Sequence, residues 1–327
     1  MDPLVKKEAD ILYQNYTALN KSFKWGSRPL NLAAAFLFSA SGRPADPDAL
    51  RRAEALLETK TRCFSPLRSN LKMPFLAKMV LSKDAEAYLD RVLALREKLG
   101  KSSVFNDDYI MLAAVILADQ LGSEDPGQAA ARTKAIYESI KERHKGLRSD
   151  ESIPLAAALA CSGMTPEAVT EEAERHYQDL RQVLKRSQDP ETISYALVLS
   201  PRPAEEKAAR FLKLLEALKA KKKRCRNDQL LIALVNLSFV DQPAERLAEE
   251  TAAADDYLKE LRGFGDFLLG PEERLIYAAQ ITVLRHLAPE KRSDNFIMSS
   301  SLTQALAAQL SLMLMTSSFV ATMIATQ

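Results

Sequence analysis

Cysteine, histidine and glycine are scarce in this chain of 327 residues, which has three, three and ten of them. The cysteines are scattered, at Cys63, Cys161 and Cys225, so they predict neither a disulfide framework nor a metal cluster. No two histidines stand at ligand spacing, and we therefore expect no metal site. We expect helices rather than strands, because glycines are few, no Asn-Gly hairpin turn occurs, and apolar residues do not alternate with polar ones.

A strong net charge and an apolar leader are also missing. The net charge is only +2, which argues against a protein that binds nucleic acid through its overall charge. The first residues, MDPLVKKEADILYQ, contain no apolar run of the kind that a signal peptide needs. We therefore expect a cytoplasmic protein. The chain has no glycine-rich phosphate loop and no Gly-x-Ser-x-Gly motif, so we predict no catalytic residue and no cofactor.

Internal repetition is the most informative feature that is present. The stretch LRSNLKMPFLAKMVLS, residues 67–82, aligns without gaps on LRSDESIPLAAALACS, residues 147–162. Two further copies run from Arg186 to Ser200 and from Arg224 to Ser238, and in all four an arginine precedes the closing serine by 14 residues. A recurrence near 40 residues indicates stacked helix pairs.

Each unit contains two kinds of helix. A short one, such as residues 152–161 or 230–237, is apolar on nearly every face and must be covered on all sides. A longer amphipathic helix follows and begins at a proline, which suits the first helical turn. These prolines are Pro47, Pro126, Pro166, Pro203 and Pro243. The residues before three of them, Asp46, Asp125 and Thr165, are expected N-caps.

These patterns predict an all-α fold, an array of about six antiparallel helix pairs, either an open α-solenoid or a closed α/α toroid. We expect one domain over residues 1–327. It would consist of an N-terminal capping helix (1–22), the helix pairs (23–263) and atypical C-terminal helices (264–327) that include an uncharged tail helix.

One cluster of polar residues invites a catalytic interpretation. His144, Asp150 and Glu151, which stand near Arg148, would supply a base and an orienting carboxylate. The competing interpretation is a joint between two helices, with the basic end of one helix followed by a Gly146 C-cap. We favour the joint, because no nucleophile motif accompanies the cluster.

The repeated arginines form a second candidate site. Stacked units would place Arg68, Arg148, Arg186 and Arg224 in one row along an edge of the array. Each arginine would either tie its joint to the preceding unit or belong to a row that binds an acidic or phosphate-bearing partner. In an enzyme or small-ligand binder, His144, Arg148 and Glu151 would line a polar pocket at the joints. We favour the structural role.

Three other features have ordinary explanations. His176 stands on the apolar side of its helix and is expected in the core. The basic run KAKKKRCR, residues 219–226, lacks the interleaved aromatics of a nucleic-acid site and is expected to be a solvated helix end. Within that run, the positive field would lower the pKa of Cys225.

The C-terminal residues 295–327 carry no charge. Their length would span a bilayer, but glutamine, serine and threonine dilute their apolar character. We favour a helix packed against protein, in the groove of the array, over its last unit or at a homodimer interface. A membrane tail-anchor and a disordered end are the alternatives.

The stretches AIYESIKERHKGLRSDESIPLAAALA, RCFSPLRSN and GFGDFLLGPEERLIYAAQITV resemble a bacterial family that is known only as a domain of unknown function. The resemblance rests on His144, Leu147 and Ser149, and on residues 263–265 and 274–279. It implies a protein of about this length that is helical throughout and found mainly in Gram-positive bacteria. It implies no activity and no ligand.

The sequence therefore favours a helical-repeat interaction or scaffold protein whose partner is a protein or peptide. An enzyme or small-ligand binder with a polar site at the joints is the first alternative. A membrane-associated module held by the C-terminal tail is the second.

Overall fold

The computed structural model describes residues 2–24, 27–69, 71–100, 107–121, 124–143, 152–184, 190–200, 202–265 and 269–286. Within these ranges the regular structure is entirely helical, with fourteen α-helices, one short 3-10 helix η1 (Pro66–Arg68) and no strand. The predicted all-α fold is confirmed.

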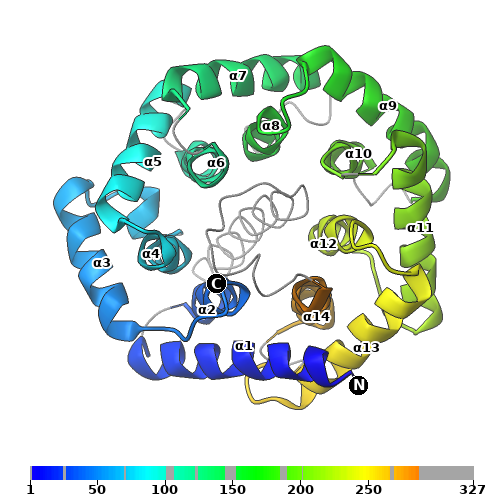
Figure 1. Cartoon of the computed structure of the whole chain (residues 1–327), viewed down its shortest axis with the longest axis horizontal. Helices are drawn as coiled ribbons and strands as arrows, with labels where there is room; N and C mark the ends of the chain where they lie inside the picture. Colours follow the sequence, from blue (N-terminus) through cyan, green and yellow to red (C-terminus); the bar gives the residue numbers. More distant parts are fainter. Residues whose placement is uncertain are drawn as a thin grey trace.

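The helices alternate between an outer and an inner layer (Figure 1). The outer helices are α1 (Pro3–Ser22), α3 (Pro47–Lys60), α5 (Ala85–Leu99), α7 (Pro126–Arg143), α9 (Pro166–Val183), α11 (Ala204–Ala220) and α13 (Ala244–Glu260). The inner helices are α2 (Arg28–Ala40), α4 (Lys72–Leu81), α6 (Asp107–Gln120), α8 (Ile153–Ala160), α10 (Pro190–Val198), α12 (Asp228–Ser238) and α14 (Pro271–His286). Each outer helix and the inner helix after it form a pair.

The seven pairs form a closed ring. In Figure 1 the inner helices are seen end-on around a common axis, while the outer helices run around the rim. The ring closes where α1 packs against α13 and α14, as well as against its own partner α2.

The closure changes how the two ends of the chain are understood. We expected residues 1–22 to be a separate capping helix, and residues 264–327 to be atypical. In the structure α1 is the outer member of the first pair and α14 is the inner member of the last. The apolar pattern of a helix shows that it is covered but does not identify the neighbour that covers it.

The two layers follow from the two kinds of helix in the sequence. In α8 every residue except Ile153 is buried, because neighbours surround a helix that is apolar all round. In α9 the residues buried at helical spacing include Val169, Ala173, His176 and Leu180, which is the single buried stripe of an amphipathic helix. The expectation that His176 lies in the core is confirmed.

The predicted helix starts are also confirmed. Asp46 accepts hydrogen bonds from the backbone N–H groups of Asp48 and Ala49. Asp125 accepts one from Gln128, and Thr165 accepts one from Ala168. Pro47, Pro126 and Pro166 begin their helices, while Pro203 and Pro243 stand one residue before α11 and α13. No helix in the described ranges is long and apolar enough to cross a bilayer.

Candidate functional sites at the joints of the ring

Of the six residues predicted to bind a partner, the described part of the chain contains two. Arg68 is half-buried, donates to the Thr61 carbonyl at 3.3 Å and pairs with Glu58 at 3.2 Å. This is the tie to the preceding helix that we favoured. Arg224 is exposed in the loop between α11 and α12. His144, Arg148, Glu151 and Arg186 lie outside the described residues, so the arginine row stays a prediction.

Other charged side chains contact the C-terminal ends of the inner helices, whereas Arg68 and Arg224 precede the N-terminal ends of α4 and α12. The last carbonyls of a helix lack hydrogen-bond donors within it, and they carry partial negative charge. Arg132, in the second turn of α7, donates through Nε to the Ala160 carbonyl at the end of α8, at 2.7 Å. Its other two nitrogens hold Glu124 at 2.7 and 3.0 Å. One arginine therefore joins an outer helix to the end of its inner partner.

Arg210 has the same role in the pair α11 and α12. Its Nε donates to the Ser238 carbonyl at 2.7 Å, and Nη2 donates to the carbonyls of Val240 and Gln242. These three carbonyls end α12 and begin the turn to α13. Burial lowers the pKa of Arg210 from its ordinary value, but a guanidinium remains protonated under any physiological condition.

The pair α9 and α10 has a carboxylate at the corresponding place. Glu172 accepts from Lys207 Nζ at 2.6 Å and lies 3.4 Å from His176 Nε2. Lys207 comes from α11 and also donates to the Val198 carbonyl at the end of α10, at 3.0 Å. Burial raises the pKa of Glu172, but the hydrogen bonds from His176 and Lys207 outweigh it and hold the pKa below its usual value. We call these three side chains the internal joint.

The place where the ring closes is built from the ends of α1 and α14. Glu250 of α13 lies 2.7 Å from His286 Nε2, and Arg285 Nη2 donates to Asp2 at 2.9 Å. Arg285 Nη1 lies 3.3 Å from His286 Nδ1. Because arginine can only donate, Nδ1 is the acceptor in this contact. Asp2, Glu250, Arg285 and His286 form what we call the closing joint.

Sequence reasoning missed these positions, although they leave a signal. Arg132 and Glu172 each stand six residues after the proline that begins their helix. Arg210 and Glu250 each stand seven residues after the proline that precedes theirs. Individually these residues look like solvated charges on amphipathic helices. What sets them apart is that each is the seventh residue of its outer helix.

A comparison with protein families matches residues 15–314 to a family described as "Protein of unknown function (DUF4003)". The chain belongs to this family. The match runs from the middle of α1 past the end of α14 and confirms the resemblance found in the sequence; the distribution among bacteria stays a prediction. Neither the curated proteins nor the solved structures gave a match.

The DUF4003 description names no chemistry, so the chemistry must be judged from the residues. Burial raises the pKa of both Cys161 and Cys225 to about 12, so neither is a reactive thiolate at neutral pH. The lowered pKa that the basic run predicted for Cys225 is therefore wrong, because its burial outweighs the effect of Lys219. The described residues contain no group of three or more ligands suited to a metal ion.

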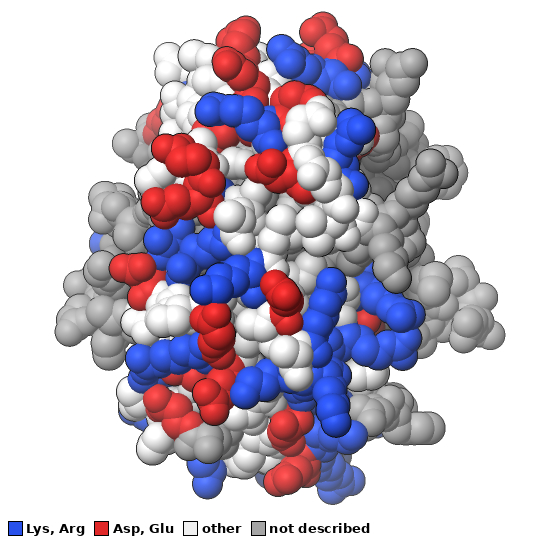
Figure 2. Space-filling model, turned by 90° about the vertical axis from the view of Figure 1, so that its right-hand side faces the viewer, with Lys and Arg blue, Asp and Glu red and all other residues white. Residues whose placement is uncertain are grey.

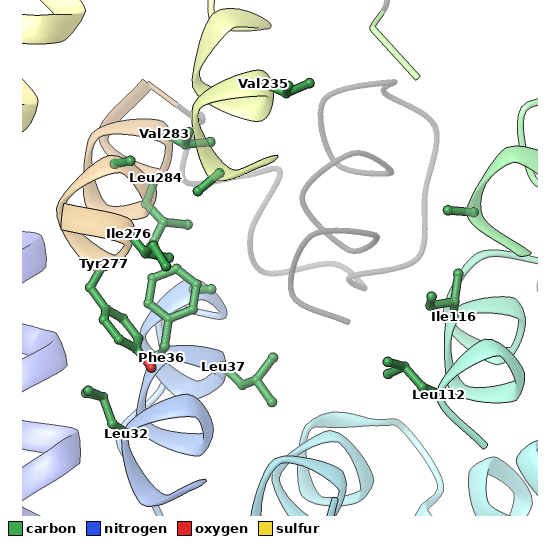
Figure 3. Close-up of a cluster of buried hydrophobic side chains, with 14 of the residues drawn as sticks. Leu32, Phe36, Leu37, Leu112, Ile116, Val235, Ile276, Tyr277, Val283 and Leu284 are labelled. Carbon is green, nitrogen blue, oxygen red and sulfur yellow. The ribbon is translucent and has the colours of Figure 1, made fainter. Parts of the chain in front are cut away.

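The inner helices also present an apolar surface to the axis of the ring. Figure 3 shows Leu37 of α2, Leu112 and Ile116 of α6 and Val235 of α12 pointing inward from different sides. Each is at most 3% exposed. We call these four side chains the inner wall.

Proposed function

We propose that this protein is a non-catalytic, cytoplasmic interaction protein that binds another protein through Phe64. The observation that supports the proposal is the exposure of Phe64, which is 99%. The other large apolar side chains that are exposed in the described ranges, Leu4 and Val183, are each about half exposed, at 51% and 53%. Single exposed apolar residues are common on proteins, so the argument also needs the setting of Phe64.

Phe64 stands on an ordered turn between α3 and η1. The Ser65 N–H donates to the Arg62 carbonyl at 3.0 Å, and the Arg68 N–H donates to the Ser65 carbonyl at 2.8 Å. Leu67, three residues after Phe64, is completely buried and anchors the turn in the core. A side chain held out by a fixed backbone loses little conformational entropy on binding.

The chemistry of the turn indicates the kind of partner. Burying a phenylalanine side chain contributes about 1.5–3 kcal/mol, and aromatic anchors in desolvated pockets supply much of the affinity of protein interfaces. Arg62, two residues before Phe64, is also exposed. We therefore expect an apolar pocket with an acidic rim on the partner, because opposite charges speed and orient association.

The buried charges and the outer surface agree with a binding role. The side chains of the internal and closing joints tie helices to one another. The side of the ring formed by α9, α11 and α13 mixes both signs of charge (Figure 2), as in the pair of Lys213 with Glu245 at 3.1 Å. Such a surface does not favour nucleic acid as the partner.

The test compares two variants of the full chain. A partner recovered from native cytosol with the wild-type protein is purified, and its dissociation constant is measured for Phe64→Ser and Val183→Ser. We expect Phe64→Ser to weaken binding by about 30-fold or more, the effect of a hot-spot residue, and Val183→Ser to leave it unchanged.

Equal affinities for the two variants would refute the proposal. Binding of the wild-type chain, but not Phe64→Ser, to lipid vesicles in place of any protein would refute it as well. An enzyme or small-ligand binder with a site at His144, Arg148 and Glu151 stays the alternative.

A further inference from the structure

We propose that the uncharged C-terminal segment, residues 295–327, occupies the interior of this chain's own ring and packs against the inner wall. The proposal is independent of the partner of Phe64. It rests on the apolar character of the inner wall, on the sequence of the segment, on the place where α14 ends and on the buried amide of Gln280.

The inner wall needs an apolar cover. Leu112 and Val235 point toward the axis from different sides of the ring (Figure 3), and they are 1% and 0% exposed. Apolar side chains gain roughly 25 cal/mol for each Å² removed from water. If the inner wall faced water, the protein would lose this stabilisation at side chains from several inner helices. The material that covers it must itself be free of unpaired charge, because burying a charge without a partner is costly.

The sequence limits which segment of the chain can be that cover. The internal ranges outside the described residues are short, the longest being 144–151, HKGLRSDE, which carries several charges. Residues 287–294, LAPEKRSD, are charged as well. Residues 295–327 are the one long stretch outside the described ranges that has no charge.

The end of α14 lies where such a segment could enter. The described chain ends at His286, which belongs to the inner layer and contacts Glu250 in the closing joint. The eight residues 287–294 separate it from the uncharged segment. At about 3.3–3.6 Å for each residue, a chain of eight residues spans at most about 26–29 Å when it is fully extended.

Gln280 adds an independent observation that the inner face of α14 has an unmet polar requirement. It stands four residues after Ile276 and three before Val283, so helical spacing places it on the face with those apolar side chains. Gln280 is 0% exposed, and neither Nε2 nor Oε1 has a hydrogen-bond partner among the described residues. A buried amide favours a cover with hydroxyl and amide groups, and the uncharged segment contains serine, threonine and glutamine.

The main test uses photo-crosslinking in the full chain. A benzophenone amino acid replaces Leu112 in one variant, Val235 in a second and exposed Phe64 in a third, as the control. After irradiation, peptides are identified by mass spectrometry and products are sized on denaturing gels. We expect both wall positions to crosslink to residues 295–327 within a single chain, and the Phe64 position not to do so.

Other crosslinks would overturn the proposal. A crosslink from the wall to residues 295–327 of a second chain would make the segment a dimer interface. Crosslinks from the wall to other helices alone would show that the wall is covered without the segment.

A second measurement leaves the wall unchanged and so does not depend on tolerance of the bulky probe. A specific protease site is inserted between Arg292 and Ser293, and the cleaved protein is passed over a gel-filtration column. We expect the fragment that begins at Ser293 to elute with the ring and to separate only in denaturant. Separation under native conditions would refute the proposal.

Discussion

The internal joint and the closing joint both pair a glutamate of an outer helix with a histidine, but they hold different parts of the chain. The internal joint ties α11 to α9 through Lys207 and Glu172, whose side chains are 5% and 11% exposed. The closing joint ties residues 283 positions apart through Arg285 and Asp2, which are 18% and 24% exposed. The joint that carries the ring closure is therefore the one with more access to water. We expect the ring to be strongest at the internal joint and to open first at the closing joint.

Removing the lysine of the internal joint should have the largest effect. Lys207→Met leaves Glu172 buried without its closest cation and removes the side-chain donor to the Val198 carbonyl. Breaking one partner of a buried pair costs about 3–5 kcal/mol, and we expect a loss of this size in the free energy of unfolding from urea titration. Lys213→Met, which removes an exposed pair with Glu245, is the control and should change stability by no more than about 0.5 kcal/mol. Equal effects would show that burial does not distinguish the two lysines.

The corresponding change in the closing joint should cost less and act more locally. Arg285→Met removes the hydrogen bonds to Asp2 and His286, and we expect a loss of about 1–3 kcal/mol. Hydrogen exchange should become faster in α1 than in α9, because α1 is the helix that the joint retains.

Arg246 provides the control for Arg285. It also contacts Glu250, at 3.0 Å, but it is half exposed and does not contact Asp2. Arg246→Met should leave exchange in α1 unchanged. If both variants accelerate exchange in α1 equally, the contact with Asp2 does not retain it.

The smallest expected effect is a pH dependence of the closing joint. An aspartate carboxyl has an ordinary pKa of about 3.9. The pKa of Asp2 lies below its ordinary value, and the hydrogen bond from Arg285 is the main cause. A carboxyl whose pKa is lower in the folded state adds stability above its unfolded pKa, and the addition is lost as pH falls through the folded pKa.

The check is the difference in urea midpoint between wild type and Asp2→Asn. The wild type should be the more stable at pH 7, and the difference should shrink as pH falls below about 3.9. A difference that stays constant down to pH 2 would show that the charge of Asp2 does not hold the joint.

Local features of the fold could be predicted from the sequence because local physics decides them. Pro166 and Thr165 mark the start of α9 whatever surrounds it, and the apolar stripe of α9 places His176 in the core. The closing joint could not be predicted, because Asp2 and Arg285 meet only once all seven pairs are stacked. The roles of Glu172 and Glu250 could not be predicted either, because their partners are distant in the sequence. Lys207 follows Glu172 by 35 residues, and His286 follows Glu250 by 36. Of the predicted binding residues, Arg68 makes the structural contacts with Thr61 and Glu58 that we favoured, and Arg224 is exposed.

The packing of α1 against α13 and α14 also limits how proteins with this fold can change in length. An open stack of helix pairs can gain or lose a pair at either end, because each pair needs only its immediate neighbours. In this closed ring the last helix pair packs against the first. Deletion of a pair would therefore leave a gap, and the ring has no room for an additional pair. We therefore expect insertions among related chains to lengthen loops and leave the number of pairs unchanged.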